Sequence, residues 1–240
     1  TLDAVSGGRL LVGAGAGGPG FDAAVLGEPD LTPRQRTGRF AEFVTLLELL
    51  LRQPVTNWAG DWYSAVEARM IPGPVQRPRP PLIVAANGPR AMRLALEVGD
   101  GWSTMGLAQY GAVGETWWAG VAQAARRFDD LVDQDGRAFE GFRRVLDMGA
   151  GAGPMTSADK LHDDVARAAS LGFTDVVERL GLSYASQEAY DLIDQLTEFI
   201  SWHAIDASAD LARERGSYPN FAGSGWSRGL VPIDTIEQME

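Results

Sequence analysis

The stretch PRPPLIVAANGPRAMRLAL, residues 78–96, contains the pattern of a strand, a tight turn and a helix in immediate succession. The apolar run Leu82–Ala86 is short and unbroken, as expected of a strand that is buried on both faces. Asn87-Gly88 is a turn signal, and Pro89 suits the first position of a helix. The apolar residues that follow at helical spacing predict one buried helix face: Ala91, Leu94, Ala95 and Val98.

This turn has the features of an anion-binding site. Free backbone N–H groups and the positive end of the helix dipole meet at the start of a helix, where they stabilise a phosphate. The candidate residues are Ala86, Asn87, Gly88 and Pro89. The alternative is an ordinary strand–helix turn of an α/β barrel, since short turns of this kind are common.

A glycine-rich segment near residue 15 is a second candidate. We predict a strand over Arg9–Val12, followed by the run from Gly13 to Gly18, which lets the backbone approach a ring or a phosphate closely. The glycine spacing partly mimics a dinucleotide-binding fingerprint. However, no acidic residue follows at the end of a second strand about 20 residues later, so a Rossmann fold is disfavoured.

The composition restricts the classes of function. The 240 residues are 45% hydrophobic and 22% charged, which is typical of a soluble globular protein with one barrel or two small domains. The net charge of −11 argues against general nucleic-acid binding, and the lack of cysteine excludes disulfides, thiolate metal sites and thiol catalysis. No apolar run approaches the roughly 20 residues of a membrane span, and we recognise no signal peptide. We therefore expect a cytoplasmic location.

Further elements follow from capping and periodicity. Thr32-Pro33-Arg34-Gln35 predicts a helix start with a capping box, and Gln53-Pro54 a helix end. Residues 55–65 read as a hairpin around Gly60, residues 115–134 as a helix, and a helix capped by Ser157 runs to about Ser170. The expected core residues of the first helix are Phe40, Phe43, Val44, Leu47, Leu50 and Leu51.

Two single residues have alternative interpretations. A lone tryptophan such as Trp102 more often packs in the core; the alternative, a place near a cofactor, is what the family resemblance given below implies. His162 has no carboxylate or second histidine at ligand spacing, which favours a surface residue.

Four segments together resemble the luciferase-like monooxygenase superfamily of flavin- and coenzyme F-420-dependent oxidoreductases. They are SGGRLLVGAGAGG (6–18), RQRTGRFAEFVTLLELL (34–50), WAGDWYS (58–64) and PGPVQRPRPPLIVAANGPRAMRLALEVGDGW (72–102). The resemblance covers residues 1–177. It implies a TIM (β/α)8 barrel with the cofactor at the carboxyl ends of the strands. The resemblance places the fourth to eighth strands of the family at residues 9–12, 82–86, 100–102, 143–148 and 173–177, so we expect an incomplete barrel.

The resemblance also implies a cofactor and a site. The cofactor is F-420, with FMN as the alternative; its phosphate is expected at Ala86–Pro89, and its ring or ribityl chain near Gly15, Ala16 and Gly17. Many F-420-dependent members carry a catalytic acid where this chain has Gly18, and the family's catalytic histidine belongs to the first three strands. We therefore assign no catalytic residue and no metal site. We expect a small-molecule substrate, no nucleic-acid or membrane partner, and leave a homodimer open.

From Gly172 onward the sequence resembles the large (α) subunit of ribonucleotide reductase, most clearly in DLARERGSYPNF (210–221) and RGLVPIDTIE (228–237). We predict a second domain over residues 178–240, mainly a long helix that begins near Ser186 and ends near Gly216, followed by an irregular end. The hypothesis is a chimera joined near Gly172, whether natural, engineered or an assembly artefact. Two alternatives to an oxidoreductase stay open: a nonfunctional or structural fragment, and a nucleotide-binding remnant of the reductase.

Overall fold

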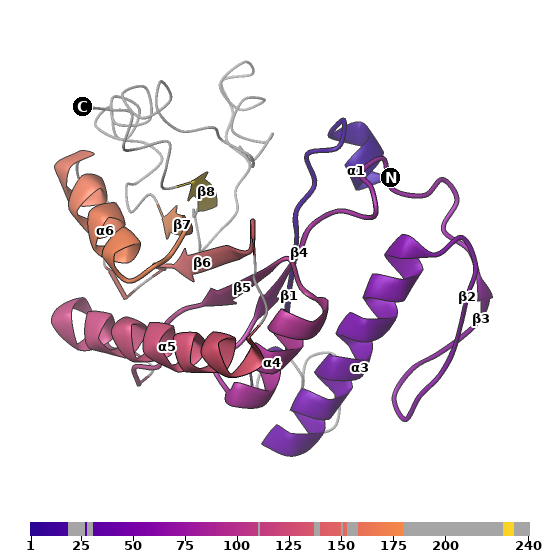
Figure 1. Ribbon diagram of the computed structural model, residues 1–240, viewed down its shortest axis with the longest axis horizontal. Coiled ribbons are helices and arrows are strands. Elements are labelled where there is room, and N and C mark those ends of the chain that lie inside the picture. Colours follow the sequence, from indigo (N-terminus) through magenta and orange to yellow (C-terminus); the bar gives the residue numbers. More distant parts are fainter. Residues whose placement is uncertain are drawn as a thin grey trace. The chain divides into compact units, whose positions relative to one another are not determined.

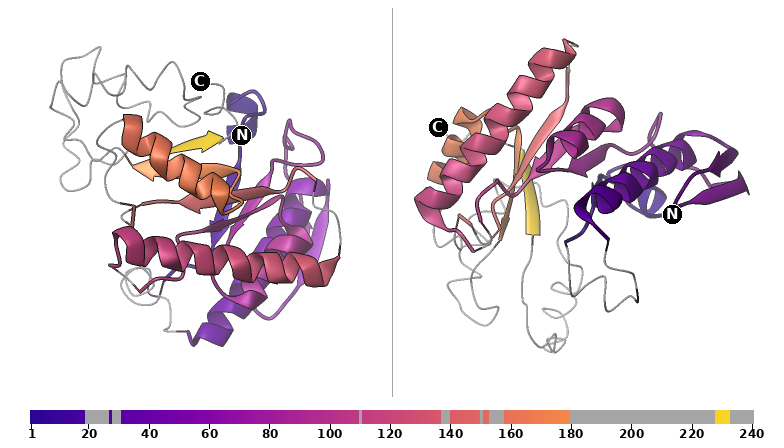
Figure 2. Two further views of the ribbon diagram at one scale, coloured as in Figure 1. Left: turned by 60° about the vertical axis from the view of Figure 1, so that its left-hand side comes forward. Right: turned by 90° about the horizontal axis from the view of Figure 1, so that it is seen from below.

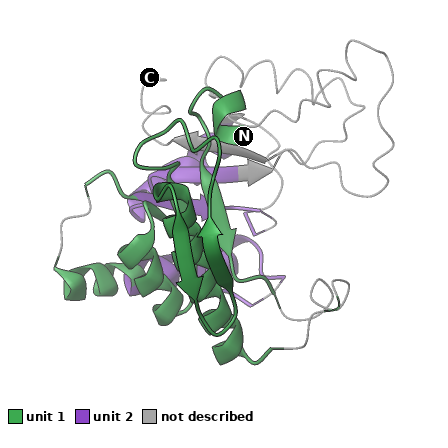
Figure 3. Cartoon of the chain, turned by 90° about the vertical axis from the view of Figure 1, so that its right-hand side faces the viewer, with its two compact units in different colours: residues 1–103, 128–142 green, residues 104–127, 143–240 purple. Residues whose placement is uncertain are grey.

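The computed structural model describes residues 1–18, 27, 31–109, 111–136, 140–149, 151–152, 158–179 and 228–232. The chain divides into two compact units, residues 1–103 with 128–142 and residues 104–127 with 143–240 (Figure 3). Each unit combines parallel strands with helices, so the α/β class predicted from the sequence is confirmed (Figure 1).

Three parallel strands build the sheet of the first unit: β1 (Val12–Gly15), β4 (Leu82–Ala85) and β5 (Gly101–Thr104). Strand β4 pairs with β1 on one side and with β5 on the other. Its first three residues are buried, as predicted for a central apolar strand. Because the strands run in the same direction, their carboxyl ends lie at one edge of the sheet.

Strand β1 follows the short helix α1 (Leu2–Val5) and begins at Val12, the residue at which the predicted strand ended. The N–H of Val12 donates to the Pro81 carbonyl at 2.9 Å, and the pairing continues as far as Gly15, opposite Ala85. The predicted bounds, Arg9–Val12, were therefore wrong. Strand pairing uses backbone groups, so the glycines that were read as the loop instead form part of the strand.

Helix α3 (Pro33–Arg52) begins at the predicted capping box. The Thr32 hydroxyl accepts a hydrogen bond from the Gln35 N–H at 3.3 Å, and the Gln35 side chain accepts one from the Thr32 N–H at 3.1 Å. Gln53 closes the helix, as expected from the proline that follows it. The local sequence was thus sufficient to predict both ends of this helix.

The buried face of α3 was predicted only in part. Phe40 and Val44 are buried, whereas Phe43 is 40% exposed and its ring lies 5.9 Å from that of Tyr63. Placing Phe43 in the core was wrong because its ring lies against the surface hairpin that contains Tyr63. Helix α3 contacts strand β2 (Thr56–Ala59) of this hairpin in addition to helix α4 (Pro89–Val98) (Figure 1). The other predicted core positions of α3, Leu47, Leu50 and Leu51, are half-buried.

The predicted hairpin is present as β2 (Thr56–Ala59) and β3 (Ser64–Ala68), which pair antiparallel beside α3 (Figure 2). Its turn is bound by one carboxylate. Glu42 of α3 accepts hydrogen bonds of 2.7–3.2 Å from the backbone N–H groups of residues 61–63. This contact attaches the hairpin to the helix through an acid that the sequence did not single out.

The second unit contains the parallel strands β6 (Arg143–Asp147) and β7 (Asp175–Arg179) and the helix α6 (Ala158–Ser170). Helix α5 (Gly114–Asp135) contributes residues to both units. Strand β8 (Arg228–Pro232) pairs antiparallel with β7 (Figure 2). All of the strands predicted for the barrel therefore exist.

Two expectations for the carboxyl-terminal part differ from the structure. Residues 228–232 were expected to be irregular but form β8, because β7 offers them an edge for pairing. Strand β7 begins at Asp175, two positions after the predicted start at Phe173, which is buried.

The long helix predicted from Ser186 lies outside the described residues. The incomplete (β/α)8 barrel and a domain division at residue 177 remain predictions. In the described ranges, no helix has the length and apolar character needed to cross a bilayer.

Candidate functional site

The turn between β4 and α4 has an open helix start. Gly88 is the N-cap in an extended conformation, with φ −97° and ψ 150°, and Pro89 occupies the first helical position. The Gly88 carbonyl accepts the N–H of Met92 at 3.0 Å, while no side chain in the described part of the chain caps the helix. A Cβ atom at Gly88 would meet nothing within 4 Å. The space beside the first-turn N–H groups of α4 is therefore not filled by a side chain at position 88.

The second predicted segment lies at the same edge of the sheet. Gly15 ends β1 directly opposite Ala85, and a Cβ atom at Gly15 would lie 3.5 Å from the Ala85 Cβ. Ala16 is half-buried, and Gly17 is exposed with a φ of +70°, which favours glycine. Adjacent parallel strands thus bring residues 15–17 and 86–89 to one sheet edge, although 70 positions separate Gly15 from Ala85.

Trp102 is a core residue and not part of the exposed edge. Its side chain is fully buried and stacks on Phe128, with ring centroids 4.2 Å apart and 4° between the planes. The indole N–H donates a 2.7 Å hydrogen bond to the carbonyl of Ala86. Of the two interpretations open for this tryptophan, packing is confirmed, but the packed ring also contacts the predicted phosphate turn.

Gly18, which stands where the resemblance implies a catalytic acid, is exposed and has no side chain that could donate a proton. His162 is exposed on α6, which confirms that it is a surface residue. Among the described residues, three carboxyl groups have a pKa below the ordinary range: Asp3, Glu42 and Glu115.

Each of those pKa values has a local cause. Hydrogen bonds from the backbone and side chain of Gln76 lower the pKa of Asp3, with a further one from the Val75 N–H. The Arg167 guanidinium, which binds Glu115 through two hydrogen bonds of 2.6 and 2.7 Å, lowers the pKa of Glu115. Each of these carboxylates is thus held by hydrogen bonds to neighbouring backbone or side-chain groups.

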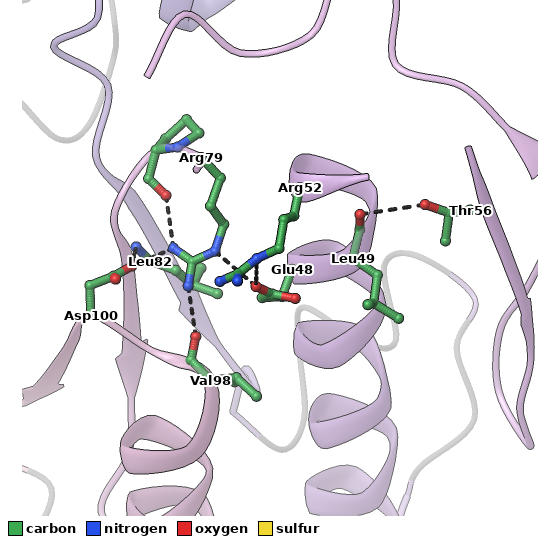
Figure 4. Close-up of polar contacts among 9 residues, drawn as sticks. Glu48, Leu49, Arg52, Thr56, Arg79, Leu82, Val98 and Asp100 are labelled. Atoms are coloured by element: carbon green, nitrogen blue, oxygen red, sulfur yellow. Dashed lines mark hydrogen bonds and ion pairs between the residues drawn. The ribbon is translucent and has the colours of Figure 1, made fainter. Parts of the chain in front are cut away.

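The opposite edge of the sheet is held by a buried arginine (Figure 4). Arg79 donates through Nε to Glu48 of α3 at 3.4 Å and through Nη2 to the Val98 carbonyl at the end of α4 at 2.9 Å. Its Nη1 binds Asp100, whose Oδ2 also accepts the Leu82 N–H at 2.8 Å. The amino-terminal edge of the sheet is therefore held by hydrogen bonds and ion pairs of one buried guanidinium.

The α/β fold with its open carboxyl-terminal sheet edge agrees with the comparison of this chain with protein families. Residues 1–133, more than half of the chain, match the luciferase-like monooxygenase family, so the chain belongs to that family. Residues 162–240 match the barrel domain of ribonucleotide reductase. Both resemblances read from the sequence are thereby confirmed, and the second match begins before Gly172.

Three curated relatives illustrate the two parts. The F420-dependent glucose-6-phosphate dehydrogenase of Beutenbergia cavernae is 34% identical over 136 residues, which are 56% of this chain and 40% of that protein. The FMNH(2)-dependent dimethylsulfone monooxygenase of Pseudomonas putida is 30% identical over 106 residues, 44% of this chain and 29% of that protein. The ribonucleoside-diphosphate reductase subunit alpha of Chlamydia trachomatis is 54% identical over 67 residues, 28% of this chain and 6% of that protein. The chain thus spans less than half of each relative.

Solved structures support the fold. An F420-dependent secondary alcohol dehydrogenase in complex with an F420-acetone adduct has a TM-score of 0.50 and 21% identity, covering 61% of this chain and 42% of that one. A monooxygenase from Streptomyces bottropensis has a TM-score of 0.50 and 20% identity, covering 88% of this chain and 53% of that one. At this level of identity the likeness concerns the fold alone.

Proposed function

We propose that this chain contributes the cofactor site of a luciferase-like oxidoreductase that binds F-420 or FMN. The observation that carries the proposal is the placement of two open turns, residues 15–17 and 86–89, at the carboxyl ends of the adjacent strands β1 and β4. Enzymes with parallel α/β architecture bind their ligands at this edge.

The phosphate of the cofactor is assigned to Ala86–Pro89. The start of α4 presents unsatisfied N–H groups and the positive end of the helix dipole, both of which stabilise an anion. Gly88 has no side chain, and no other atom lies within 4 Å of the position that its Cβ atom would take. A phosphate can therefore reach the N–H groups of the helix start. In a chain with a net charge of −11, such a local donor site is needed to hold a phosphate against general repulsion.

The ring or ribityl chain is assigned to Gly15, Ala16 and Gly17. These residues offer backbone with little side-chain bulk beside the phosphate turn, which permits close approach of a flat group. A bound deazaflavin or flavin supplies the hydride or dioxygen chemistry, and the protein binds and orients it. F-420 is preferred to FMN on the resemblance of the sequence, and the substrate is a small molecule.

Direct titration tests this function. The purified chain is titrated with F-420 and, separately, with FMN, while tryptophan fluorescence is followed. Saturable quenching by one of them supports the proposal and selects the cofactor. No binding of either by a chain that unfolds cooperatively contradicts it and favours a structural fragment. Binding of nucleoside diphosphate or triphosphate without flavin favours a nucleotide-binding remnant of the reductase.

We further propose that the two family matches reflect a join between two unrelated sequences near Gly172. The segment GFTDVV, residues 172–177, suits both families, and such shared sequence is where recombination or misassembly joins two genes. Sequencing of single long DNA molecules from the source tests this. Molecules that continue on either side as an uninterrupted luciferase-like or reductase frame contradict a natural join.

A further inference from the structure

We propose that Trp102 is a positioning residue that holds the phosphate-binding turn in its working geometry. This inference rests on the cofactor site proposed above and adds a residue that does not itself touch the ligand. The argument begins with the contacts of Ala86, the first residue of the turn. Both of its backbone polar groups are bound by residues of β5.

The two hydrogen bonds come from consecutive residues of β5. The N–H of Ala86 donates to the Ser103 carbonyl at 2.9 Å, which extends the strand ladder by one position. The carbonyl of Ala86 instead accepts the indole N–H of Trp102 at 2.7 Å. Where the chain leaves the sheet, the hydrogen-bond partner of Ala86 is thus a side chain, the Trp102 indole, and no longer the backbone of β5. The peptide plane before Ala86 is thereby held by the Ser103 carbonyl, and the plane after Ala86 by the Trp102 indole.

The indole is itself immobilised. Phe128 of α5 stacks on it at 4.2 Å, and Phe142 lies 5.9 Å beyond Phe128 in a second stacked pair. Trp102 is 0% exposed and Phe128 is 1% exposed. The aromatic stack therefore sets the direction of the indole N–H. A buried ring that keeps one orientation makes a fixed donor for the Ala86 carbonyl.

Geometry at the helix start depends on this donor. The Ala86 carbonyl and the N–H of the next residue belong to one rigid peptide plane, and Gly88 begins the helix directly afterwards. Ala86 is 7% exposed, so water does not readily replace the indole. Loss of the donor leaves a buried carbonyl unpaired or rotates the plane, and displacements of about 1 Å are costly at a binding site.

The competing explanation is that Trp102 only packs the core. The two explanations differ in one measurable quantity, the gain in affinity that the phosphate group provides. That gain is the ratio of dissociation constants for riboflavin and FMN, or for F-420 and its phosphate-free deazaflavin. Core damage weakens both ligands of a pair alike, whereas a displaced turn weakens the phosphorylated ligand alone.

The test measures this ratio in three proteins. Trp102→Phe keeps an aromatic ring against Phe128 but removes the N–H donor, and we expect the ratio to fall roughly threefold to tenfold, the range expected for one hydrogen bond. Val44→Ala is the matched control. It leaves a cavity at a fully buried position of α3 that takes no part in the aromatic stack, so it lowers the unfolding midpoint while the ratio stays within about twofold of wild type.

Each outcome decides a separate point. If wild-type protein binds no member of either pair, the proposed cofactor site is wrong and the inference falls with it. If wild type shows a phosphate gain and Trp102→Phe retains it in full, Trp102 only packs. If Trp102→Phe does not fold, benzothienylalanine incorporated at position 102 replaces the N–H by sulfur at nearly the same volume. A reduced ratio in that protein supports the inference, and an unchanged ratio overturns it.

Discussion

Arg79 donates a 2.9 Å hydrogen bond to the carbonyl of Val98, the last residue of α4. A helix leaves its final carbonyls without internal partners, and here a buried guanidinium supplies one of the missing donors. The side chain of Arg79 is 4% exposed and also binds Glu48 of α3 and Asp100 before β5 (Figure 4). One side chain thus connects two helices to the sheet.

Replacement of Arg79 by methionine is expected to lower the free energy of unfolding by roughly 2–4 kcal/mol, because it leaves buried or half-buried acceptors without their donor. Urea denaturation followed by tryptophan fluorescence measures the change. Arg52→Met is the control: Arg52 binds the same Glu48 at 2.6 Å but its side chain is 50% exposed, so the expected cost is below about 1 kcal/mol. Equal losses of unfolding free energy in the two variants would show that the burial of Arg79 does not increase its contribution to stability.

Glu42 makes the hairpin sensitive to acid. Removal from water raises the pKa of Glu42, but the hydrogen bonds from the Tyr63 and Trp62 N–H groups, the Trp58 indole and the Asp61 N–H together lower it below the ordinary value. A carboxyl with a lowered pKa in the folded state stabilises the protein above its unfolded pKa. That contribution disappears as the pH falls through the folded pKa.

We therefore expect Glu42→Gln to be less stable than wild type at pH 7, and the difference to shrink as the pH falls below about 4. Amide hydrogen exchange at residues 61–63 should accelerate in the variant at neutral pH. Glu97→Gln, which removes one exposed charge from α4, should show neither effect. A stability difference between Glu42→Gln and wild type that stays constant from pH 7 to pH 3 contradicts the assignment.

Two glycines inside helices should respond oppositely to alanine. A Cβ atom at Gly120 of α5 would lie 2.4 Å from the Ala108 N, whereas one at Gly38 of α3 would meet nothing within 4 Å. Gly38→Ala should raise the free energy of unfolding by about 1 kcal/mol through helix propensity. Gly120→Ala should lower it by roughly 1–3 kcal/mol, since backbone must move. Thermal or urea unfolding checks both, and stabilisation by Gly120→Ala would mean that the close contact is absent in solution.

Gly88→Asp separates binding from stability. The extended conformation of Gly88 accepts aspartate, and a carboxylate at an N-cap stabilises the helix by a few tenths of a kcal/mol. The same carboxylate occupies the helix N–H groups and repels a phosphate, so affinity for F-420 or FMN should fall more than tenfold. Ligand titration and thermal unfolding are measured together.

The control for this variant is Gly38→Asp, which adds the same charge to an exposed glycine of α3. Its affinity for either cofactor should stay within about twofold of wild type. Unchanged affinity in Gly88→Asp would discard the phosphate site, while equal losses in both variants would indicate a general effect of the added charge.

Local signals predicted the elements best where one segment contained all the interacting groups. The capping box of Thr32 and Gln35 placed the start of α3, and Asn87-Gly88-Pro89 placed the turn between β4 and α4. Strand β1 was placed too early because the residues that pair with it, Leu82–Ala85, are far along the chain. Strand β8 was missed for the same reason, since only β7 makes it a strand.

The candidate site was likewise predicted in its separate segments but not in their spatial arrangement. Residues 15–17 and 86–89 were recognised one by one, but their common sheet edge follows from the parallel pairing of β1 with β4. The contact between the Trp102 indole and the Ala86 carbonyl was not foreseen, because a burial pattern does not give the direction of a ring. The sequence likewise did not indicate that Glu42 binds the hairpin turn, because the residue lies in an ordinary helical pattern.

The sequence by itself thus determined the α/β class, the family and the order of the helices and strands as far as β7, because these depend on periodicity, capping and motifs within short segments. Only the tertiary structure decided the true bounds of β1, the strand character of residues 228–232 and the donors that hold the turn at Ala86. Those features arise from hydrogen bonds between residues far apart in the chain. Their partners are chosen by how the sheet is assembled, which no local pattern encodes.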